Sequence, residues 1–557
     1  MILTKWAVRD VIRDAIYKAV ETGRISHEGE LPDIKVEYPK EERFGDYATP
    51  FALECARILK RSPLDIGETL KPFIESHEMI ERVEVVKPGF INIFLSIDFF
   101  VSRIYDAIAN HDAYGTSDAE KKEKYNIEFV SANPTGPLNV VSARAAALGD
   151  SLGNILEAAG HDVDREFYVN DYGNQVNLFG KSVYYRYREL SGETVDFPDD
   201  GYQGDYVKDI ARSILDTGAF RADMFPNEEE IIEFMSTYAI DYILNGQQKI
   251  MKEFRVNYDR WFRESELHAG DDVERVFTLL AEKGYLYDDD GKKVFRATDF
   301  GDDKDRVVVR EDGRPTYLMA DIAYHNNTLK RGYDTLIDIW GPDHHGYIAR
   351  LAGAVEALGY ERSRFKVLIA QQVNLILDGE PVKMSKRLGR FSTMKDLIDD
   401  IGVDASRYFF VMRSMDSHLD FDLDLARRAS SENPVFYLQY AHARICSVFK
   451  EAEKRGIDTA ADSLNSVHID TPETVSLVKT LVRFPEEVQD AAQSLEVHRI
   501  ATYLMRLAQQ YHKFYTVNRI LTDDADRTAS LLALCRAVQI TIHNGLRLLG
   551  VSAPETM

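Results

Sequence analysis

The spacing of apolar and polar positions changes along the chain, and the first segment mixes helical with β-like patterns. Residues 1–20 place apolar side chains at helical intervals broken by Lys, Arg and Asp, which predicts an amphipathic helix. This segment does not resemble a signal peptide, because it lacks an unbroken apolar core and a small-residue cleavage site. Residues 84–96, EVVKPGFINIFLS, predict two strands joined by a Pro-Gly turn at 88–89. We therefore expect a mixed α+β domain over residues 1–115.

A strand–turn–helix pattern begins at residue 125. YNIEFVSA (125–132) predicts a buried strand, SANPTGPL (131–138) a turn, and the small and apolar residues of 142–160 a helix. Strand, glycine-containing turn and helix form the first unit of a doubly wound nucleotide-binding sheet. The alternation returns later, with strands predicted at 334–341 and 365–377 around a helix at 346–359. The sequence therefore predicts a Rossmann-type domain.

The remaining patterns are helical. Residues 180–255 are charged and helical, and we interpret them as an insertion in the sheet domain. From residue 404 to the end, almost every stretch is typical of an amphipathic helix, which predicts a bundle. The expected fold is multidomain α/β: an N-terminal α+β domain (1–115), a Rossmann-type catalytic domain (116–403) and an all-α bundle (404–557).

Composition supports several domains and limits the classes of protein. At 557 residues the chain is too long for one core, and its 45% hydrophobic and 29% charged residues are those of a soluble globular protein. No stretch approaches the apolar length of a membrane span. The three cysteines form no CxxC pair, which argues against zinc or a disulfide framework and fits a reducing compartment. A net charge of −24 argues mildly against nucleic acid, although a local basic patch can still bind it.

Two loops contain candidate chemistry. Residues 131–138 lie between a strand and a helix, where backbone N–H groups attract phosphate and Gly136 allows close approach. Residues 382–387, VKMSKR, place two lysines and an arginine in a polar loop that can neutralise a triphosphate. Taken alone, the first loop is better explained as an ordinary turn, and the alternative interpretation of the second is a solvated basic turn.

A third cluster combines a helix with a polar loop. Tyr317 and Asp321 are four residues apart, so on a helix they share one face. GPDHH (341–345) follows the strand predicted after them. An aspartate turned toward a pocket would bind a cation, whereas a single helical aspartate is usually only solvated.

Together these segments resemble a known family. SANPTGPL, YVNDYGNQVNLFG (168–180), WGPDHHGY (340–347), VKMSKRLGRF (382–391) and the ending LLGVSAPETM resemble bacterial arginyl-tRNA synthetases in sequence and order. The resemblance extends over essentially the whole chain. KMSK alone would indicate class I synthetases in general, and the other motifs restrict the resemblance to arginyl-tRNA synthetases.

The resemblance implies ligation of L-arginine to tRNA-Arg through an arginyl-adenylate, with ATP and Mg²⁺ and without protein-bound zinc or any other protein metal site. It further implies an N-terminal domain that contacts the tRNA D-loop, an anticodon-binding bundle, a requirement for tRNA in adenylate formation, a monomer, and a cytoplasmic location. Neither chemical step needs a protein nucleophile, so catalysis depends on positioning and charge.

The resemblance also implies roles for individual residues. The residues expected to bind arginine are Ser131, Asn133, Glu264, Tyr317 and Asp321. Those expected at ATP are Pro134, Gly136, Asn139, Ser142, Gly341, Asp343, His344, Met384 and Ser385. Those expected to act on the phosphates are Lys383, Lys386, Asn139 and Ser142. Those expected at the tRNA are Phe44, Tyr47, Asn92, Tyr437, Tyr440, Arg444 and Met557. Paired carboxylates match the donor fork of a guanidinium, which one ammonium group cannot reproduce.

The chain departs from the family at residues 139–142. The family signature there is His-x-Gly-His, but this chain has Asn139-Val140-Val141-Ser142. Asn139 and Ser142 still offer hydrogen-bond donors without the charge of an imidazolium, Val141 adds two methyl groups, and Ser142 is a candidate helix cap. We expect an active enzyme that replaces the lost donors. The alternatives are a paralogue that binds tRNA or arginine without adenylation, and an arginine ligase with another acceptor.

Overall fold

The computed structural model describes residues 3–27, 29–382, 393–460, 467 and 469–557. The predicted N-terminal helix and hairpin are confirmed, and they form a small α+β domain. Its antiparallel sheet has the order β1-β3-β2. Its elements are α1 (Thr4–Glu21), β1 (Tyr47–Thr49), α2 (Phe51–Leu59), α3 (Pro63–Glu75), β2 (Ile80–Val86) and β3 (Phe90–Leu95).

The central domain contains the predicted parallel sheet, with the strand order β11-β10-β4-β5-β6. The strands are β4 (Lys124–Phe129), β5 (Asp162–Val169), β6 (Arg260–Arg263), β10 (Thr335–Trp340) and β11 (Phe365–Ile369). The helices beside them are α5 (Val140–Ala158), α11 (Tyr317–Lys330) and α12 (Ile348–Leu358). From β4 the chain first extends the sheet in one direction and later in the other. The carboxyl ends of β4 and β10 therefore form a topological switch point, where open α/β sheets bind ligands.

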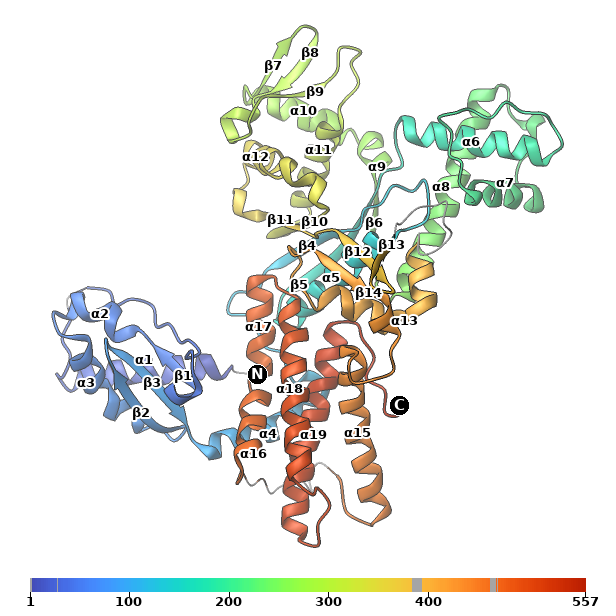
Figure 1. Ribbon diagram of the computed structural model, residues 1–557. Helices are drawn as coiled ribbons and strands as arrows, with labels where there is room; N and C mark the ends of the chain where they lie inside the picture. The colour runs from blue at the N-terminus through green and yellow to red at the C-terminus, as the bar shows by residue number, and fades with distance from the viewer. Residues whose placement is uncertain (1–2, 28, 383–392, 461–466, 468) are drawn as a thin grey trace.

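Two excursions leave this sheet. The helical insertion predicted over 180–255 consists of α6 (Asn174–Leu190), α7 (Asp205–Thr217) and α8 (Glu228–Glu253). The second excursion has no counterpart in the sequence prediction. It consists of α9 (Glu264–Ala269), α10 (Asp272–Glu282), β7 (Leu286–Asp289), β8 (Lys292–Phe295) and β9 (Arg306–Val309). In Figure 1 both project away from the helical bundle.

A small sheet and a bent helix connect the catalytic domain to the bundle. The sheet has the order β13-β12-β14. Its strands are β12 (Val373–Leu377), β13 (Glu380–Val382) and β14 (Leu419–Asp422), and the helices beside them are α13 (Met394–Val411) and α14 (Leu423–Arg427). Helix α13 spans the predicted boundary at 404, and it bends at Gly402, whose φ of 79° is left-handed.

The C-terminal part is the predicted helical bundle. It contains α15 (Pro434–Lys454), α16 (Pro472–Leu481), α17 (Phe484–Ser494), α18 (His498–Val517) and α19 (Ala525–Leu548). Helix α4 (Ile97–Asn110), predicted within the N-terminal domain, instead packs against α16 and α19. Asn544 Nδ2 secures the following turn by donating to the carbonyl oxygens of His111 and Tyr114, at 2.8 and 2.9 Å. The structure thus ends the N-terminal domain near residue 96, before the predicted boundary at 115.

Short 3-10 turns complete the described elements: η1 (Glu42–Phe44), η2 (His111–Ala113), η3 (Ala222–Met224), η4 (Ala297–Phe300), η5 (Pro342–Tyr347) and η6 (Arg362–Arg364). Among the described residues, no helix combines the length and apolar character needed to cross a bilayer.

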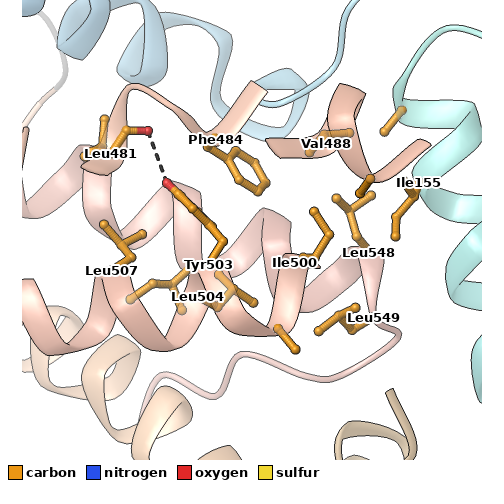
Figure 2. Close-up of a cluster of buried hydrophobic side chains, with 14 of the residues drawn as sticks. Ile155, Leu481, Phe484, Val488, Ile500, Tyr503, Leu504, Leu507, Leu548 and Leu549 are labelled. Atoms are coloured by element: carbon orange, nitrogen blue, oxygen red, sulfur yellow. Dashed lines mark hydrogen bonds between the residues drawn. The ribbon is translucent and has the colours of Figure 1, made fainter. Parts of the chain in front are cut away.

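The bundle core reaches the catalytic domain. Figure 2 shows Ile155 of α5 beside the buried side chains of the bundle, and the Tyr503 hydroxyl donates to the Leu481 carbonyl oxygen at 3.2 Å. Because Ile155 and Leu504 are both fully buried, the far half of α5 packs on the bundle. The first turn of the same helix lies at the switch point.

Candidate active site

A cavity of about 280 Å³ opens at the carboxyl ends of β4 and β10. It brings together Ser131, Asn133, Asp321, Gly341 and His344, which sequence analysis had taken from three separate segments. The lining also includes Glu128, Tyr168, Asn170, His325, Asp338 and Tyr347, which sequence analysis had not selected. These residues could have been found from the sequence by their position, because each lies near the end of a strand or about one helical turn from a selected residue.

Two carboxylates, the buried Glu264 and the half-buried Asp321, give the site its chemical character. Glu264 is 4% exposed, and burial, reinforced by the charge of Asp321, raises its pKa to about 7. Burial also raises the pKa of Asp321, whose carboxylate accepts a hydrogen bond from the Tyr347 hydroxyl. With its amide turned to donate, Asn170 lies 3.1 Å from Glu264 Oε2. Two acids whose pKa values are raised make a site for a cationic ligand.

Tyr317 shares a cavity with Glu264 and not with Asp321. It begins α11 and is 58% exposed, and it lines a second cavity of about 130 Å³ together with Glu264, Tyr172 and His268. The rings of Tyr172 and His268 stack with centroids 3.8 Å apart. Tyr317 and Asp321 do lie on one helix, as predicted, but they line different cavities.

The altered signature forms the capped start of α5. Asn139 is the N-cap, and its Oδ1 accepts hydrogen bonds from Ser142 N at 2.9 Å and from Ser142 Oγ at 3.1 Å. The sequence prediction that Ser142 caps this helix is wrong, because Ser142 lies three residues inside it and donates to the true cap. Asn139 is exposed, and Val141 is 38% exposed. Both therefore face outward at the positively polarised end of the helix.

The loop before the signature is held by the insertion. Tyr206 of α7 donates to the Thr135 carbonyl oxygen at 2.8 Å, and Gln247 of α8 donates to the Gly136 carbonyl oxygen at 3.0 Å. Pro134 is buried beside them. Sequence analysis could not find Tyr206 and Gln247, since they are 71 and 111 residues from their partners.

Ser131 and Asn133 occupy the start of the same loop. Ser131 Oγ donates to Glu128 Oε1 at 2.7 Å and accepts from Tyr168 N at 3.2 Å. Asn133 is exposed, and its Nδ2 donates to Gln175 Oε1 at 3.2 Å. Their side chains are thereby directed from β4 toward the neighbouring strand and the insertion.

The opposite edge of the cavity is formed by η5. Asp343 and His344 are both exposed on this turn, directly after Gly341. Lys383, Met384, Ser385 and Lys386 lie outside the described residues. The strand before them, β13, ends at Val382.

A buried arginine connects α5 to the strands on either side of the KMSK loop. Arg144 is fully buried, and it donates to the carbonyl oxygens of Gln371 at 2.5 Å, Ser417 at 3.0 Å and Ser414 at 3.1 Å. Sequence analysis did not select it. Because these carbonyl groups lie before β12 and before β14, Arg144 fixes the small sheet against the signature helix.

The predicted anticodon surface forms an aromatic and cationic cluster on the bundle. Tyr440 is 41% exposed, and the Arg444 guanidinium lies 4.0 Å from the centroid of the Tyr515 ring. His512 lies 4.7 Å from the Tyr437 ring. Met557 is also exposed, at 54%. Sequence analysis missed His512 and Tyr515 because they come from α18, which packs beside α15.

Three residues of the N-terminal domain were predicted to contact tRNA, and two of them are buried. Tyr47 is 3% exposed because its hydroxyl donates to Glu486 of the bundle at 2.9 Å, and Asn92 is 3% exposed on the neighbouring strand. Burial does not fit a direct contact, so we do not carry these two residues into the proposed interface. Phe44 is partly exposed beneath the Arg43 guanidinium, 4.8 Å from its ring.

Comparison with protein families matches each part of the chain. Residues 7–95 match the arginyl tRNA synthetase N terminal domain, residues 103–413 the catalytic domain of class I (R) tRNA synthetases, and residues 438–557 the DALR anticodon binding domain. The parallel sheet, its switch-point cavity and the C-terminal bundle therefore define a class I aminoacyl-tRNA synthetase.

Individual relatives show which family of class I synthetases the chain resembles. The chain is 46% identical to an arginine–tRNA ligase of Leptospira interrogans, over 95% of this chain and 94% of the relative. It is 44% identical to the arginine–tRNA ligase of Bacillus subtilis, over 99% of both. A Campylobacter jejuni structure described as an arginyl-tRNA synthetase superposes with a TM-score of 0.76 at 35% identity, covering 83% of this chain and all of that one. The chain belongs to the arginyl-tRNA synthetase family.

Proposed function

We propose that this chain joins L-arginine to tRNA-Arg through an arginyl-adenylate and releases AMP and pyrophosphate. The observation that supports this most directly is the combination of two carboxylates with raised pKa values, the buried Glu264 after β6 and the half-buried Asp321 in the switch-point cavity. Arginine is the amino acid whose planar, permanently charged side chain suits two acceptors.

In this proposal the guanidinium of arginine lies between Glu264 and Asp321. Asn170 and Tyr347 hold the two carboxylates in place by donating to them. The amino-acid end of the substrate then extends toward Ser131 and Asn133. Lysine would leave acceptors of this site unpaired, and sites of this kind reject the poorer analogue by roughly 10⁴-fold.

ATP binds across the first turn of α5 and η5 in this proposal. The phosphates lie at the helix N-terminus, where Asn139 Nδ2 donates in place of an imidazole. Asp343 and His344 hold the nucleoside, and Lys383 and Lys386 neutralise the triphosphate. Mg²⁺ arrives with the phosphates of ATP and needs no dedicated protein site.

The chemistry requires positioning more than reactive side chains. The arginine carboxylate attacks the α-phosphate in line and displaces pyrophosphate, after which a hydroxyl of the terminal tRNA adenosine attacks the activated carbonyl and displaces AMP. Donors around the phosphates stabilise the charge that develops in the first step.

The tRNA contacts two separate surfaces in this proposal. The cluster of Tyr440, Arg444, His512 and Tyr515 stacks on anticodon bases, as aromatic and guanidinium groups do with unpaired RNA, and Tyr437 and Met557 border it. Phe44 contacts the tRNA from the N-terminal domain. We further propose that the enzyme is a cytoplasmic monomer.

The alternatives receive no support from the site. A paralogue without adenylation would have no need of the KMSK sequence beside a complete acidic pocket. The altered signature still forms a capped helix start with an available amide donor. An arginine ligase with a different acceptor would have no need of both tRNA-facing domains.

The test is arginine-dependent exchange of pyrophosphate into ATP, with and without tRNA-Arg and with lysine as the control amino acid. We expect exchange only with arginine and tRNA-Arg. Asp321→Asn should raise KM for arginine about 100-fold or more, because truncating one buried charge partner leaves the other groups poorly paired, while the Kd for tRNA stays unchanged. Exchange absent from wild-type protein that still binds tRNA-Arg would favour the paralogue instead.

A further inference from the structure

Two carboxylates and one imidazole meet at the floor of the large cavity. The parallel register of β10 and β4 places Asp338 opposite Glu128, so both side chains lie on the same face of the sheet. His325 of α11 lies against them, and the ligating atoms of the three groups are within 4.8 Å of one another. Two carboxylates this close would repel each other strongly without a positive charge between them.

The hydrogen bonds of His325 determine which protons it carries. Its Nδ1 lies 2.8 Å from the carbonyl oxygen of Asp321, which can only accept, so Nδ1 is protonated. Its Nε2 lies 3.0 Å from Asp338 Oδ2, and Asp338 is 2% exposed. A carboxylate so deeply buried needs a donor, so Nε2 is protonated as well.

The charge state of His325 follows from this geometry. A ring protonated on both nitrogens is an imidazolium. Burial alone would lower the pKa of His325, but the charges of Asp338 and Glu128 outweigh burial and raise it to about 9. The imidazolium therefore persists at neutral pH and pairs with Asp338. Burial raises the pKa of Glu128 to about 8, and the positive charge of His325 opposes that rise.

The position of this imidazolium connects it to both halves of the arginine site. Its Nδ1 holds the backbone of Asp321, whose side chain lines the cavity and is proposed to bind the guanidinium. Its charge faces Glu128, which accepts from Ser131 at the amino-acid end. One ring thus connects α11, β10 and β4 around the cavity.

We propose that His325, as a buried imidazolium, is a positioning residue that preorganises the arginine site by fixing Asp321 and Glu128. The inference rests on the proposed arginine site, and His325 itself touches no reacting atom. A protonated ring has no lone pair for a metal, so this arrangement excludes a divalent cation held by Glu128, His325 and Asp338.

The experiment compares His325→Ala with His442→Ala. His442 is a matched control because it is also buried, at 4% exposure, and its Nδ1 likewise faces a carbonyl oxygen, that of Pro554, but it lies in the bundle. Arginine affinity is measured by calorimetry, KM values for arginine and ATP by pyrophosphate exchange, Tm by thermal unfolding, and bound metal by elemental analysis.

We expect His325→Ala to weaken arginine binding about 30-fold or more while KM for ATP changes less than about threefold. Added imidazole should enter the enlarged cavity and restore part of the arginine affinity. His442→Ala should lower Tm comparably, leave arginine affinity unchanged and show no rescue.

The inference fails if His325→Ala keeps wild-type arginine affinity, or if both variants lose affinity equally. It also fails if wild-type protein holds a divalent ion that His325→Ala loses. Wild-type protein that binds arginine without catalysing exchange would count against the proposed function alone, since the calorimetric comparison would still decide the role of His325.

Discussion

At the scale of single residues, the unusual feature is a nucleotide site whose signature carries no imidazole. The Asn139 side chain has two ends with separate tasks. Its oxygen is occupied by Ser142 N and Ser142 Oγ, and this orients the amide so that its nitrogen is free to donate outward. Ser142 therefore orients the Asn139 side chain. A neutral donor at a helix start replaces a charged one, supported by the helix dipole.

The two tasks of Asn139 can be separated with Asn139→Asp. Aspartate keeps the oxygen that caps α5, so Tm should stay close to the wild-type value, whereas alanine would cost about 1 kcal/mol of stability. Aspartate also removes the N–H donor and adds a negative charge facing phosphate, so KM for ATP should rise about tenfold or more. Pyrophosphate exchange and thermal unfolding measure both effects. An unchanged KM for ATP would remove Asn139 from the phosphate site.

The buried acid Glu264 gives arginine binding a pH dependence. Its pKa of about 7 lies above the unfolded value of about 4.3, so the folded state holds the proton more tightly. Its contribution to stability is fully present below about pH 4.3 and is lost as the pH rises through about 7. Guanidinium binding requires the ionised carboxylate, so arginine affinity should increase between about pH 6 and pH 8, by at most about tenfold per pH unit.

Calorimetric titration with arginine across this range measures the effect. Glu264→Gln should weaken arginine binding and flatten its pH dependence, while ATP affinity stays the same. If the variant retains the wild-type slope, the titrating group is elsewhere.

At the scale of elements, α5 connects the nucleotide site to the bundle, and its glycines decide how closely it packs. A Cβ built at Gly149 would lie 2.3 Å from Cγ of Phe129, the last residue of β4. Gly246 in α8 has no neighbour within 4 Å of the same position. Both glycines therefore lie within helices, but only Gly149 has close neighbours at the position of an added Cβ.

Gly149→Ala should consequently destabilise the protein by about 1–3 kcal/mol through overpacking. Gly246→Ala should stabilise it by about 0.5–1 kcal/mol, since alanine is the better helix former. Urea unfolding of both variants gives the two free-energy changes. Equal effects of the two substitutions would show that helix propensity outweighs packing at Gly149.

Sequence patterns predicted the local elements because each depends on neighbouring residues. The strand at 125–132 and the helix after it follow directly from the spacing of apolar residues and from the Pro and Gly residues of the turn between them. The structure confirms both elements as β4 and α5. Contacts between distant segments could not be predicted in this way. Ser142 was a candidate cap of α5, and only side-chain geometry decides between Asn139 and Ser142. Gln247 is 111 residues from the carbonyl group to which it donates.

At the scale of the whole molecule, buried charges join the domains. Arg407 of α13 is fully buried and donates to Asp150 of α5 at 2.5 Å and to the Leu549 carbonyl oxygen at 2.9 Å. The guanidinium of Arg407 thereby joins the catalytic domain to the bundle. The N-terminal domain is attached differently, through a carboxylate that accepts several donors.

That carboxylate is Glu486 of α17, which is 1% exposed. It accepts from the backbone N–H of Lys5 at 2.5 Å, from the Tyr47 hydroxyl at 2.9 Å, and from the Tyr38 hydroxyl. All three donors belong to the N-terminal domain. A single amide oxygen cannot replace two carboxylate oxygens, so Glu486→Gln leaves at least one donor poorly paired, at a cost of about 1–3 kcal/mol.

We expect Glu486→Gln to loosen the N-terminal domain while the rest of the protein stays folded. Backbone amides of β1 and β3 should exchange with solvent faster, and those of β4 and β10 at the wild-type rate. Glu487→Gln is the matched control, since Glu487 is the next residue and pairs with Arg499 and Arg506 of the bundle. Equal exchange of β1 and β3 in the two variants would show that apolar packing, and not the buried carboxylate, holds the domain. Faster exchange in Glu486→Gln alone, with weaker tRNA binding, would mean that tRNA recognition depends on the N-terminal domain being fixed to the bundle.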